Sequence, residues 1–550
     1  MPQPTQPPNV ILIMTDQHRA DALGCAGDPI IQTPNIDALA QGGVHFTNAY
    51  VQCPVCMASR AAIHTGRYPR SLRMPSMGIL PPEETTIAET LRRNGYATGM
   101  FGKLHFTPMG FTRLNLNSEV PLDVDRFLGP TGIDSPWSRR AAQDPMKKSY
   151  GFDETIGVED SLWGHWLDWL EKESPEHAKY AQTENWRASR SELKYGENAR
   201  RMFHPDVSDF FDSRMPAELS ASRFIVDRSI DYIRRNAHRP FFVHCSFVDP
   251  HHPFNAPEPF SRMYDPADMP LPPAADLSTF PGPLRGVASD KIEQMQNFPD
   301  ELLQWAQANY YGMISNIDDC IGRLISTLDE LGLRENTLIL FTADHGDHVG
   351  GRHRMIYKSP PLFDDIMRVP FIINGPGAGG QGGIAAGNQV DGLVQEIDIY
   401  PTLMSLLGLP IHGGVQGHDL TPLFTGGQTV SNENAGNGPP WGDLPEAGIP
   451  AAEKPAHAAA PAYDWVFCEL DDLPQADYVA NAAVRTQDWK LNYFHHSRTG
   501  LMFNLREDPD ERVNLFDDPG YAGQRWELTT QLLDMYDVIK DPLPHRLTQA

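Results

Sequence analysis

Two seven-residue apolar segments constrain the fold of this chain more than any other feature. They read NVILIMT at residues 9–15 and TLILFTA at residues 337–343, and an acidic residue, Asp16 or Asp344, follows each of them at once. A segment that is apolar at nearly every position and rich in β-branched residues suits a strand buried on both faces, as in parallel sheets covered by helices. We therefore expect an α/β fold with a large mixed, mostly parallel sheet sandwiched by helices.

The segments between and after these two runs alternate between helical and strand-like patterns. Helices are expected at residues 34–41, with Thr33 as N-cap, and at 86–94, 219–236, 301–333 and 394–408, and further strands at 240–248 and 369–375. This alternation is typical of α/β proteins, whose ligands gather beyond the carboxyl ends of the strands. Asp16 and Asp344 both occupy such strand ends.

The length of the chain predicts more than one folding unit. At 550 residues it exceeds one ordinary core, since domains usually hold about 100 to 200 residues. We expect a main α/β domain at 1–425, a linker or loop rich in Gly, Pro and Ala at 426–462, and a small α+β subdomain at 463–550 with a helix near 526–539.

The charge balance limits the partners. Lys and Arg number 45 against 71 Asp and Glu, which gives a net charge of −26 and a surface that repels nucleic acid. The opening MPQPTQPPNVILIMTDQ has no basic leader, and its apolar run is too short for a membrane span. We expect a cytoplasmic protein that binds neither nucleic acid nor membranes, and a homodimer or homotetramer is typical of acidic proteins of this size.

Six cysteines are too few and too scattered for a disulfide framework in so long a chain. In CPVCMASRAAIHTG, Cys53 and Cys56 match the Cys-x-x-Cys spacing of redox proteins, although no thioredoxin-sized unit surrounds them. Alternatively, Cys56 begins a helix that Gly66 ends, and Arg60 lies one turn on, where an anionic sulfur or oxygen would be stabilised. A third interpretation is a buried thiol beside a surface arginine.

The strand ends carry a possible metal site. Asp16, Asp344 and His345 come from distant parts of the chain but follow equivalent strands, so one fold can bring them together. Carboxylates with one imidazole suit a hard divalent cation rather than structural zinc, which prefers thiolates. The alternative is that these acids cap helices or begin turns, which is the commoner role of any one such residue.

The pattern Cys56-x-Ala58-x-Arg60, followed by Thr65-Gly66-Arg67, resembles the signature of the sulfatase family in the alkaline phosphatase superfamily. The resemblance implies an alkaline phosphatase-like fold with residues 1–425 as the catalytic domain. It also implies that a formylglycine-generating maturation enzyme oxidises Cys56 to formylglycine, whose hydrate is the nucleophile, while Cys53 is a bystander.

Further motifs extend the resemblance along the chain. Asp16-Gln17 matches the first metal pair, FGKLHF and DPHHPF match motifs that carry Lys103, His105 and His251, and ADHGDHVGGRHRMIYK matches the run from Asp344 and His345 to Lys358, with one extra residue. Met77 replaces an asparagine common in relatives. The implied metal ligands are Asp16, Gln17, Cys56, Asp344 and His345, with Ca²⁺ or Mn²⁺ favoured over Mg²⁺. The implied catalytic residues are Cys56, Arg60, Lys103, His105, His251 and Lys358.

The resemblance implies an arylsulfatase that hydrolyses small sulfate monoesters through a covalent sulfo-enzyme. Arg60 and the metal would hold the ester and the hydrate, Lys103 would neutralise sulfate charge, and His251 with Lys358 would stabilise or protonate the leaving oxygen. His105 would then deprotonate the second hydroxyl. One alternative is a phosphonate monoester hydrolase or phosphodiesterase with the same nucleophile and metal. Another is a binding protein in which Cys56 is never oxidised.

Overall fold

A computed structural model describes most of the chain, namely residues 7–81, 83–106, 150–159, 164–184, 213–273, 300–358, 361–376, 384–425, 463–471, 480–495 and 497–540. Its centre is an eight-stranded sheet with the order β4-β3-β5-β1-β6-β7-β2-β8. Only β7 runs antiparallel to its neighbours in this sheet. The strands are β1 (Asn9–Thr15), β2 (Val44–Tyr50), β3 (Ala97–Gly102), β4 (Glu154–Gly157), β5 (Phe241–Ser246), β6 (Thr337–Ala343), β7 (Arg368–Asn374) and β8 (Asn388–Gln395).

The two apolar runs form β1 and β6, which pair side by side in parallel, as the sequence predicts. Thr15 pairs with Ala343, and the Asp344 N–H donates to the Thr15 carbonyl at 3.2 Å. Because the pairing keeps both strands in register to their last residues, Asp16 and Asp344 leave the sheet at the same edge. This fixes the place of the site before any side-chain contact is considered.

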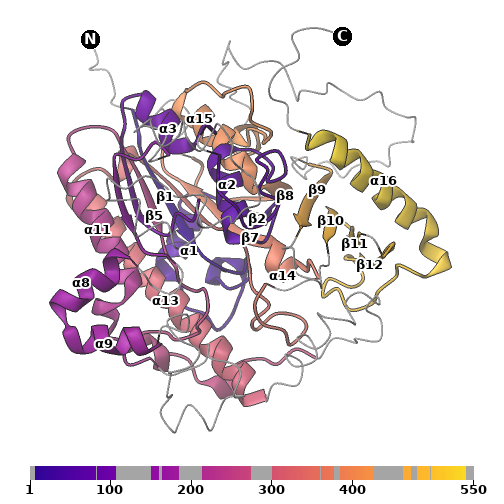
Figure 1. The fold of residues 1–550 in the computed structure, drawn as a ribbon, viewed down its shortest axis with the longest axis horizontal. Helices are drawn as coiled ribbons and strands as arrows, with labels where there is room; N and C mark the ends of the chain where they lie inside the picture. The colour runs from indigo at the N-terminus through magenta and orange to yellow at the C-terminus, as the bar shows by residue number, and fades with distance from the viewer. Residues whose placement is uncertain are drawn as a thin grey trace, which may run out of the picture.

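Helices cover both faces of the sheet, which explains why β1 is buried throughout and apolar at five of its seven positions. Val10, Leu12 and Met14 belong to one core, whereas Ile11 and Ile13 belong to the other. Helices α2 (Cys56–Thr65), α3 (Ile87–Arg93) and α15 (Ile399–Leu407) pack into the first core. Helices α1 (Pro34–Gln41), α8 (His165–Glu173), α9 (Pro175–Glu184), α11 (Ala221–Asn236) and α13 (Asp300–Glu330) pack into the second (Figure 1).

The predicted helices mostly form with the expected caps. Thr86 caps α3, because its hydroxyl accepts from the Glu89 N–H, and Gly66 ends α2 in the left-handed region at φ 67°. Thr33 precedes α1 as predicted, but its hydroxyl donates to Asp37 instead of accepting from the helix backbone. The helix expected at 394–408 is partly wrong, since Val394 and Gln395 finish β8 and α15 begins at Ile399.

The described residues of the C-terminal subdomain form an antiparallel four-stranded sheet and the long helix α16, the yellow lobe of Figure 1. The sheet order is β12-β11-β10-β9, and the elements are β9 (Trp465–Leu470), β10 (Asn481–Thr486), β11 (Trp489–Phe494), β12 (Thr499–Asn504) and α16 (Ala522–Val538). The predicted linker at 426–462 lies outside the described residues. The domain borders at 425 and 463 therefore stay predictions.

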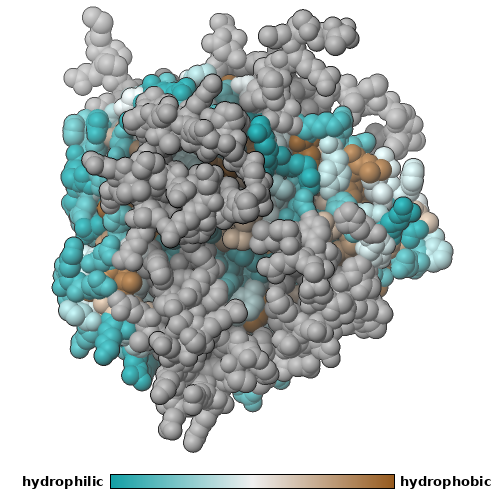
Figure 2. Space-filling model, in the orientation of Figure 1, coloured by the Kyte–Doolittle hydropathy of each residue, from teal (hydrophilic) through white to brown (hydrophobic). Residues whose placement is uncertain are grey.

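The surface shown in Figure 2 is mostly hydrophilic along the edge that α8, α9 and α11 form. Large apolar side chains are exposed at isolated positions, among them Trp526 and Leu533 on α16. Within the described part of the chain, the structure contains no helix that combines the length and apolar character needed to cross a membrane.

Candidate functional site

Four buried side chains from three segments meet beyond the carboxyl ends of β1 and β6. The potential ligand atoms of Asp16, Cys56, Asp344 and His345 all lie within 4.8 Å of one another. The Cys56 thiol is 3.2 Å from His345 Nε2 and donates to Asp16 Oδ1 at 3.8 Å. We call these four residues the cysteine cluster. The sequence prediction that both strand ends and the signature cysteine share one place agrees with this geometry.

Arg60 fastens the cluster from below. Cys56 is the first residue of α2, and Arg60, one turn later, donates from Nε to Asp344 at 2.7 Å and from Nη2 to Asp16 at 3.2 Å. Its Nη1 donates to the Lys103 carbonyl at 2.6 Å and to Ser246 Oγ at 2.8 Å. Arg60 is therefore a fully buried brace between four strand ends, and the interpretation of it as a surface arginine is wrong.

Two lysines from distant parts of the sequence contact the cysteine cluster. Lys103 follows β3 and makes a buried ion pair with Asp16. Lys358 Nζ lies 2.6 Å from Cys56 Sγ and 2.9 Å from His345 Nε2. Lys358 therefore contacts the cysteine in spite of the extra residue that precedes it in the motif.

Charge and burial set opposite protonation states within the cluster. Burial alone would raise the pKa of Asp16, but Lys103, His251 and Arg60 hold that pKa well below its ordinary value. Burial, reinforced by Asp16, raises the pKa of the Cys56 thiol to about 12. A redox cysteine needs a thiolate, which this setting disfavours, and none of the six cysteines forms a disulfide. The geometry thus argues against a thioredoxin-like pair.

Gln17 adds a possible oxygen ligand for a cation to the cysteine cluster. Its backbone lies in the left-handed region at φ 64°, and its N–H donates to Asp344 Oδ1 at 3.1 Å. The side-chain amide donates to Asp347 and to His252 Nδ1, while Oε1 is buried and has no hydrogen-bond partner among the described residues. Two carboxylates, an imidazole and a spare carbonyl oxygen form a donor set that fits a hard divalent cation.

The two other predicted histidines lie on neighbouring segments. His251 follows β5, and its ring stacks on His252 with centroids 4.0 Å apart. His105 has a left-handed backbone at φ 56°, and its N–H donates to Glu159 Oε1 at 3.2 Å. His252 is more than a spacer, since it contacts both Gln17 and the Tyr357 ring.

Glu159 and Asp347 are supporting residues that sequence reasoning missed. Glu159 accepts from the N–H groups of Leu104 and His105 and so fixes the segment after Lys103. Asp347 accepts from Gln17 and from the Tyr357 N–H, which closes the loop before Lys358. The spacing Asp-His-Gly-Asp could have drawn attention to Asp347. Glu159 stands in no motif, so only the fold identifies it.

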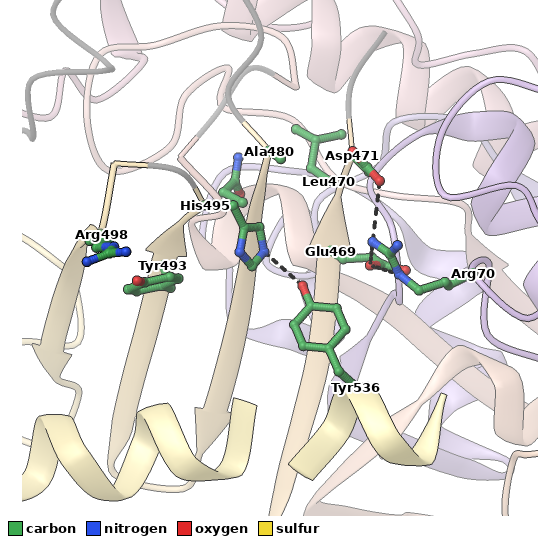
Figure 3. Close-up of a pocket in the computed structure, with 10 residues that line it drawn as sticks. Arg70, Glu469, Leu470, Asp471, Ala480, Tyr493, His495, Arg498 and Tyr536 are labelled. Atoms are coloured by element: carbon green, nitrogen blue, oxygen red, sulfur yellow. Dashed lines mark hydrogen bonds and ion pairs between the residues drawn. The ribbon is translucent and has the colours of Figure 1, made fainter. Parts of the chain in front are cut away.

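Met77, predicted to replace a polar neighbour of the site, is an exposed residue, with 51% of its surface accessible to solvent. A cavity of about 710 Å³ lies between Arg70 of the α/β part and residues of the C-terminal subdomain (Figure 3). Figure 3 shows Arg70 and Glu469 at one end of it and Tyr493 and Arg498 at the other. None of its lining residues is a residue predicted for the site.

The comparisons with known proteins agree with this geometry. Residues 8–409 match the family model described as Sulfatase, and this range includes every residue predicted for the site. The ulvan-active sulfatase of Formosa agariphila is 31% identical over 426 residues, which cover 77% of this chain and 66% of that protein. This chain thus spans slightly less than two thirds of the length of that relative.

Two further proteins resemble most of the chain. The arylsulfatase of Clostridium perfringens is 32% identical over 433 residues, which cover 76% of this chain and 78% of that protein. The crystal structure of a phosphonate monoester hydrolase of Agrobacterium radiobacter has a TM-score of 0.71 at 25% identity and covers 98% of both chains.

Proposed function

This chain belongs to the sulfatase family, a family of sulfuric ester hydrolases, and we propose that it hydrolyses sulfate monoesters of the aryl sulfate type. The observation that carries the proposal is the position of Cys56. It begins α2 and lies buried against Asp16, His345 and Lys358. A nucleophile at this position would face cationic groups that stabilise negative charge on an attacking oxygen and on a transferred sulfate.

Two groups complete the proposed site. Formylglycine, made from Cys56 by a maturation enzyme, supplies a hydrated aldehyde as nucleophile. Asp16, Gln17, Asp344, His345 and residue 56 would hold a divalent cation, Ca²⁺ or Mn²⁺ before Mg²⁺, which supplies positive charge to the nucleophile and the ester oxygens. The covalent sulfo-enzyme expected from the family resemblance is part of this proposal.

The chain's own residues then divide the work by position. Arg60 is locked by Asp16 and Asp344, so it supplies a fixed positive charge below residue 56. Lys358 Nζ contacts the side chain of residue 56, so it stabilises negative charge on the attacking oxygen there. Together with His251 it also stabilises the charge on the leaving oxygen. As the matching motifs imply, Lys103 neutralises negative charge on the sulfate group. His105 accepts the proton of the second hydroxyl of the formylglycine hydrate.

The second candidate is hydrolysis of phosphonate monoesters or phosphodiesters in the same site. The fold similarity to a phosphonate monoester hydrolase over the whole chain favours it. Against it stand Lys103 and His105, because an ammonium and an imidazole suit a terminal group with three equivalent charged oxygens. A phosphorus diester replaces one of these oxygens with a substituent. We therefore expect the hydrolysis of such phosphorus esters to be a slower side reaction of the same site.

A kinetic comparison tests the choice. Metal-loaded, matured enzyme is assayed with 4-nitrophenyl sulfate, the 4-nitrophenyl ester of phenylphosphonate and bis(4-nitrophenyl) phosphate. The proposal expects the highest kcat/KM for the sulfate. A higher value for the phosphonate ester would transfer the assignment to the second candidate and leave the nucleophile and metal proposals in place. Cytoplasmic location and a homodimeric or homotetrameric state remain predictions.

A further inference from the structure

A buried ion cluster joins the α/β part of the protein to the C-terminal subdomain. Its members are Arg352, Asp364 and Asp365 from the former and Lys490 and Glu511 from the latter, and we call it the interdomain ion cluster. We propose that Glu511 is a positioning residue that seats the loop 344–358 and thereby holds Lys358 against residue 56. This inference rests on the proposed function, because it assumes that Lys358 takes part in the hydrolysis.

The loop 344–358 is a closed unit with site residues at both ends. Asp344 and His345 begin it, and Lys358 ends it. The His348 N–H donates to the Tyr357 carbonyl at 3.1 Å, and the Tyr357 N–H donates to Asp347 at 2.9 Å. Because the loop is closed in this way, a shift of its middle part also shifts Lys358.

The loop contacts helix α14 (Asp364–Met367) at its beginning through the backbone of Gly346 and at its middle through Arg352. The Gly346 N–H donates to the Ile366 carbonyl at 3.0 Å. A Cβ at Gly346 would lie 1.9 Å from the Asp365 carbonyl oxygen, so the two backbones touch. Arg352 adds two hydrogen bonds to the Asp365 carboxylate, from its N–H at 3.0 Å and from Nη1 at 3.1 Å.

Glu511 holds both sides of this contact from the C-terminal subdomain. Its Oε2 accepts from the Asp364 N–H at 2.8 Å and lies 3.5 Å from Arg352 Nη1. Its Oε1 lies 2.6 Å from Lys490 Nζ, which in turn pairs with Asp364 at 3.0 Å. One carboxylate therefore contacts α14, the loop arginine and β11, and its backbone adopts the left-handed region at φ 57°.

The interdomain ion cluster is better explained as a device that positions the loop than as a source of folding stability. Taking charges out of water costs several kcal/mol per ion, so a buried ion pair contributes little net stability compared with apolar residues. A bridging carboxylate does fix the relative position of the three segments that it contacts. The expected result of losing it is a loop that samples other positions, with Lys358 misplaced during the reaction. A misplacement of about 1 Å can reduce a rate about 100-fold.

The experiment compares Glu511→Gln with Asp488→Asn in the full-length enzyme. Asp488 pairs with Arg506 at the surface of the same subdomain at 2.6 Å, so it controls for loss of an ion pair away from the loop. Both variants are assayed with 4-nitrophenyl sulfate and with phenyl sulfate, whose leaving group is poorer. Metal content and hydrogen exchange of the loop peptide are measured in parallel. Arg352→Lys and the double variant complete a thermodynamic cycle, and Arg352→Lys stands in for Glu511→Gln if that variant fails to fold.

The inference expects Glu511→Gln to lose about tenfold in kcat for phenyl sulfate and less for the nitrophenyl ester, with KM within about twofold and full metal content. Exchange in the loop should be faster, and the double variant should be no slower than the worse single variant. Wild-type-like kcat in Glu511→Gln, or equal losses for both esters, would overturn it. If wild-type enzyme prefers the phosphonate ester, the proposed function fails, and the same kcat and exchange criteria decide the inference on aryl phosphonate esters.

Discussion

Lys358 Nζ lies 2.6 Å from Cys56 Sγ, although 302 residues separate the two in the sequence. Cys56 follows β2 and Lys358 follows β6, and β7 pairs with both of these strands in the same sheet. The closed loop before Lys358 completes the approach. The contact places Lys358 beside residue 56 as a third cationic side chain, in addition to Arg60 and Lys103.

Replacing Arg60 tests the brace below the cluster. Arg60→Met leaves the buried carboxylates of Asp16 and Asp344 without their shared guanidinium, so we expect a loss of about 3–5 kcal/mol in the free energy of unfolding. Urea unfolding in the presence of a chelator measures it. Arg234→Ala, which breaks an exposed pair with Glu330, should change stability by less than about 1 kcal/mol. Equal effects of the two changes would contradict the brace.

Replacing a strand-end carboxylate tests the metal site. Asp16→Ala or Asp344→Ala removes a ligand of the proposed hard cation, and we expect bound metal and sulfatase activity to fall together. Metal analysis of purified protein provides the readout. Asp231→Ala, which breaks the exposed pair with Arg228, should keep both metal and activity. Full metal occupancy in both cluster variants would show that the two strand ends do not share a site.

Replacing Lys103 tests the preference for sulfate. Lys103→Ala removes the cation proposed to meet the oxygen that only a sulfate monoester presents at this position. We expect kcat/KM for 4-nitrophenyl sulfate to fall by a larger factor than kcat/KM for bis(4-nitrophenyl) phosphate. Equal factors for the two substrates would show that Lys103 supports the fold or the metal without selecting the substrate.

Asp398 makes stability depend on pH at a place far along the chain from the cluster. Burial raises its pKa from 3.8 to about 7, against the hydrogen bonds that Tyr463 and the His418 and Gln395 N–H groups donate to it, and nearby Asp419 raises it further. A raised pKa in the folded state stabilises the fold below the ordinary pKa of 3.8, and this contribution is lost as pH rises through about 7. The stability of Asp398→Asn relative to wild type should therefore increase between pH 5 and pH 8. Urea unfolding measures the free energy of unfolding of both proteins at each pH. A difference between the two proteins that does not change from pH 5 to pH 8 would refute this assignment.

The sequence predicts the parts of the fold that local pattern and strand chemistry determine. The apolar runs predict β1 and β6 and the shared edge of Asp16 and Asp344, and Thr86 and Gly66 mark helix ends correctly. Pattern alone does not give the direction of β7, because direction depends on the connection between strands. Val394 and Gln395 join β8 because pairing with β2 overrides their helical context.

The residues of the site divide in the same way. Those in motifs, from Asp16 to Lys358, can be named from spacing and resemblance. Glu159 and Glu511 act through backbone N–H groups and charges that only the folded chain places beside them. A lone glutamate between secondary-structure elements carries no signal that distinguishes such a role from a solvated surface charge.

The chemical state of residue 56 in active enzyme tests the account most directly. Enzyme produced together with a maturation enzyme is digested, treated with an aminooxy reagent that reacts with aldehydes, and analysed by peptide mass spectrometry. We predict an aldehyde at Cys56 and an unmodified thiol at Cys53, and Cys53→Ala should keep most of the activity. Fully active enzyme with an unmodified thiol at Cys56 would contradict the proposed mechanism.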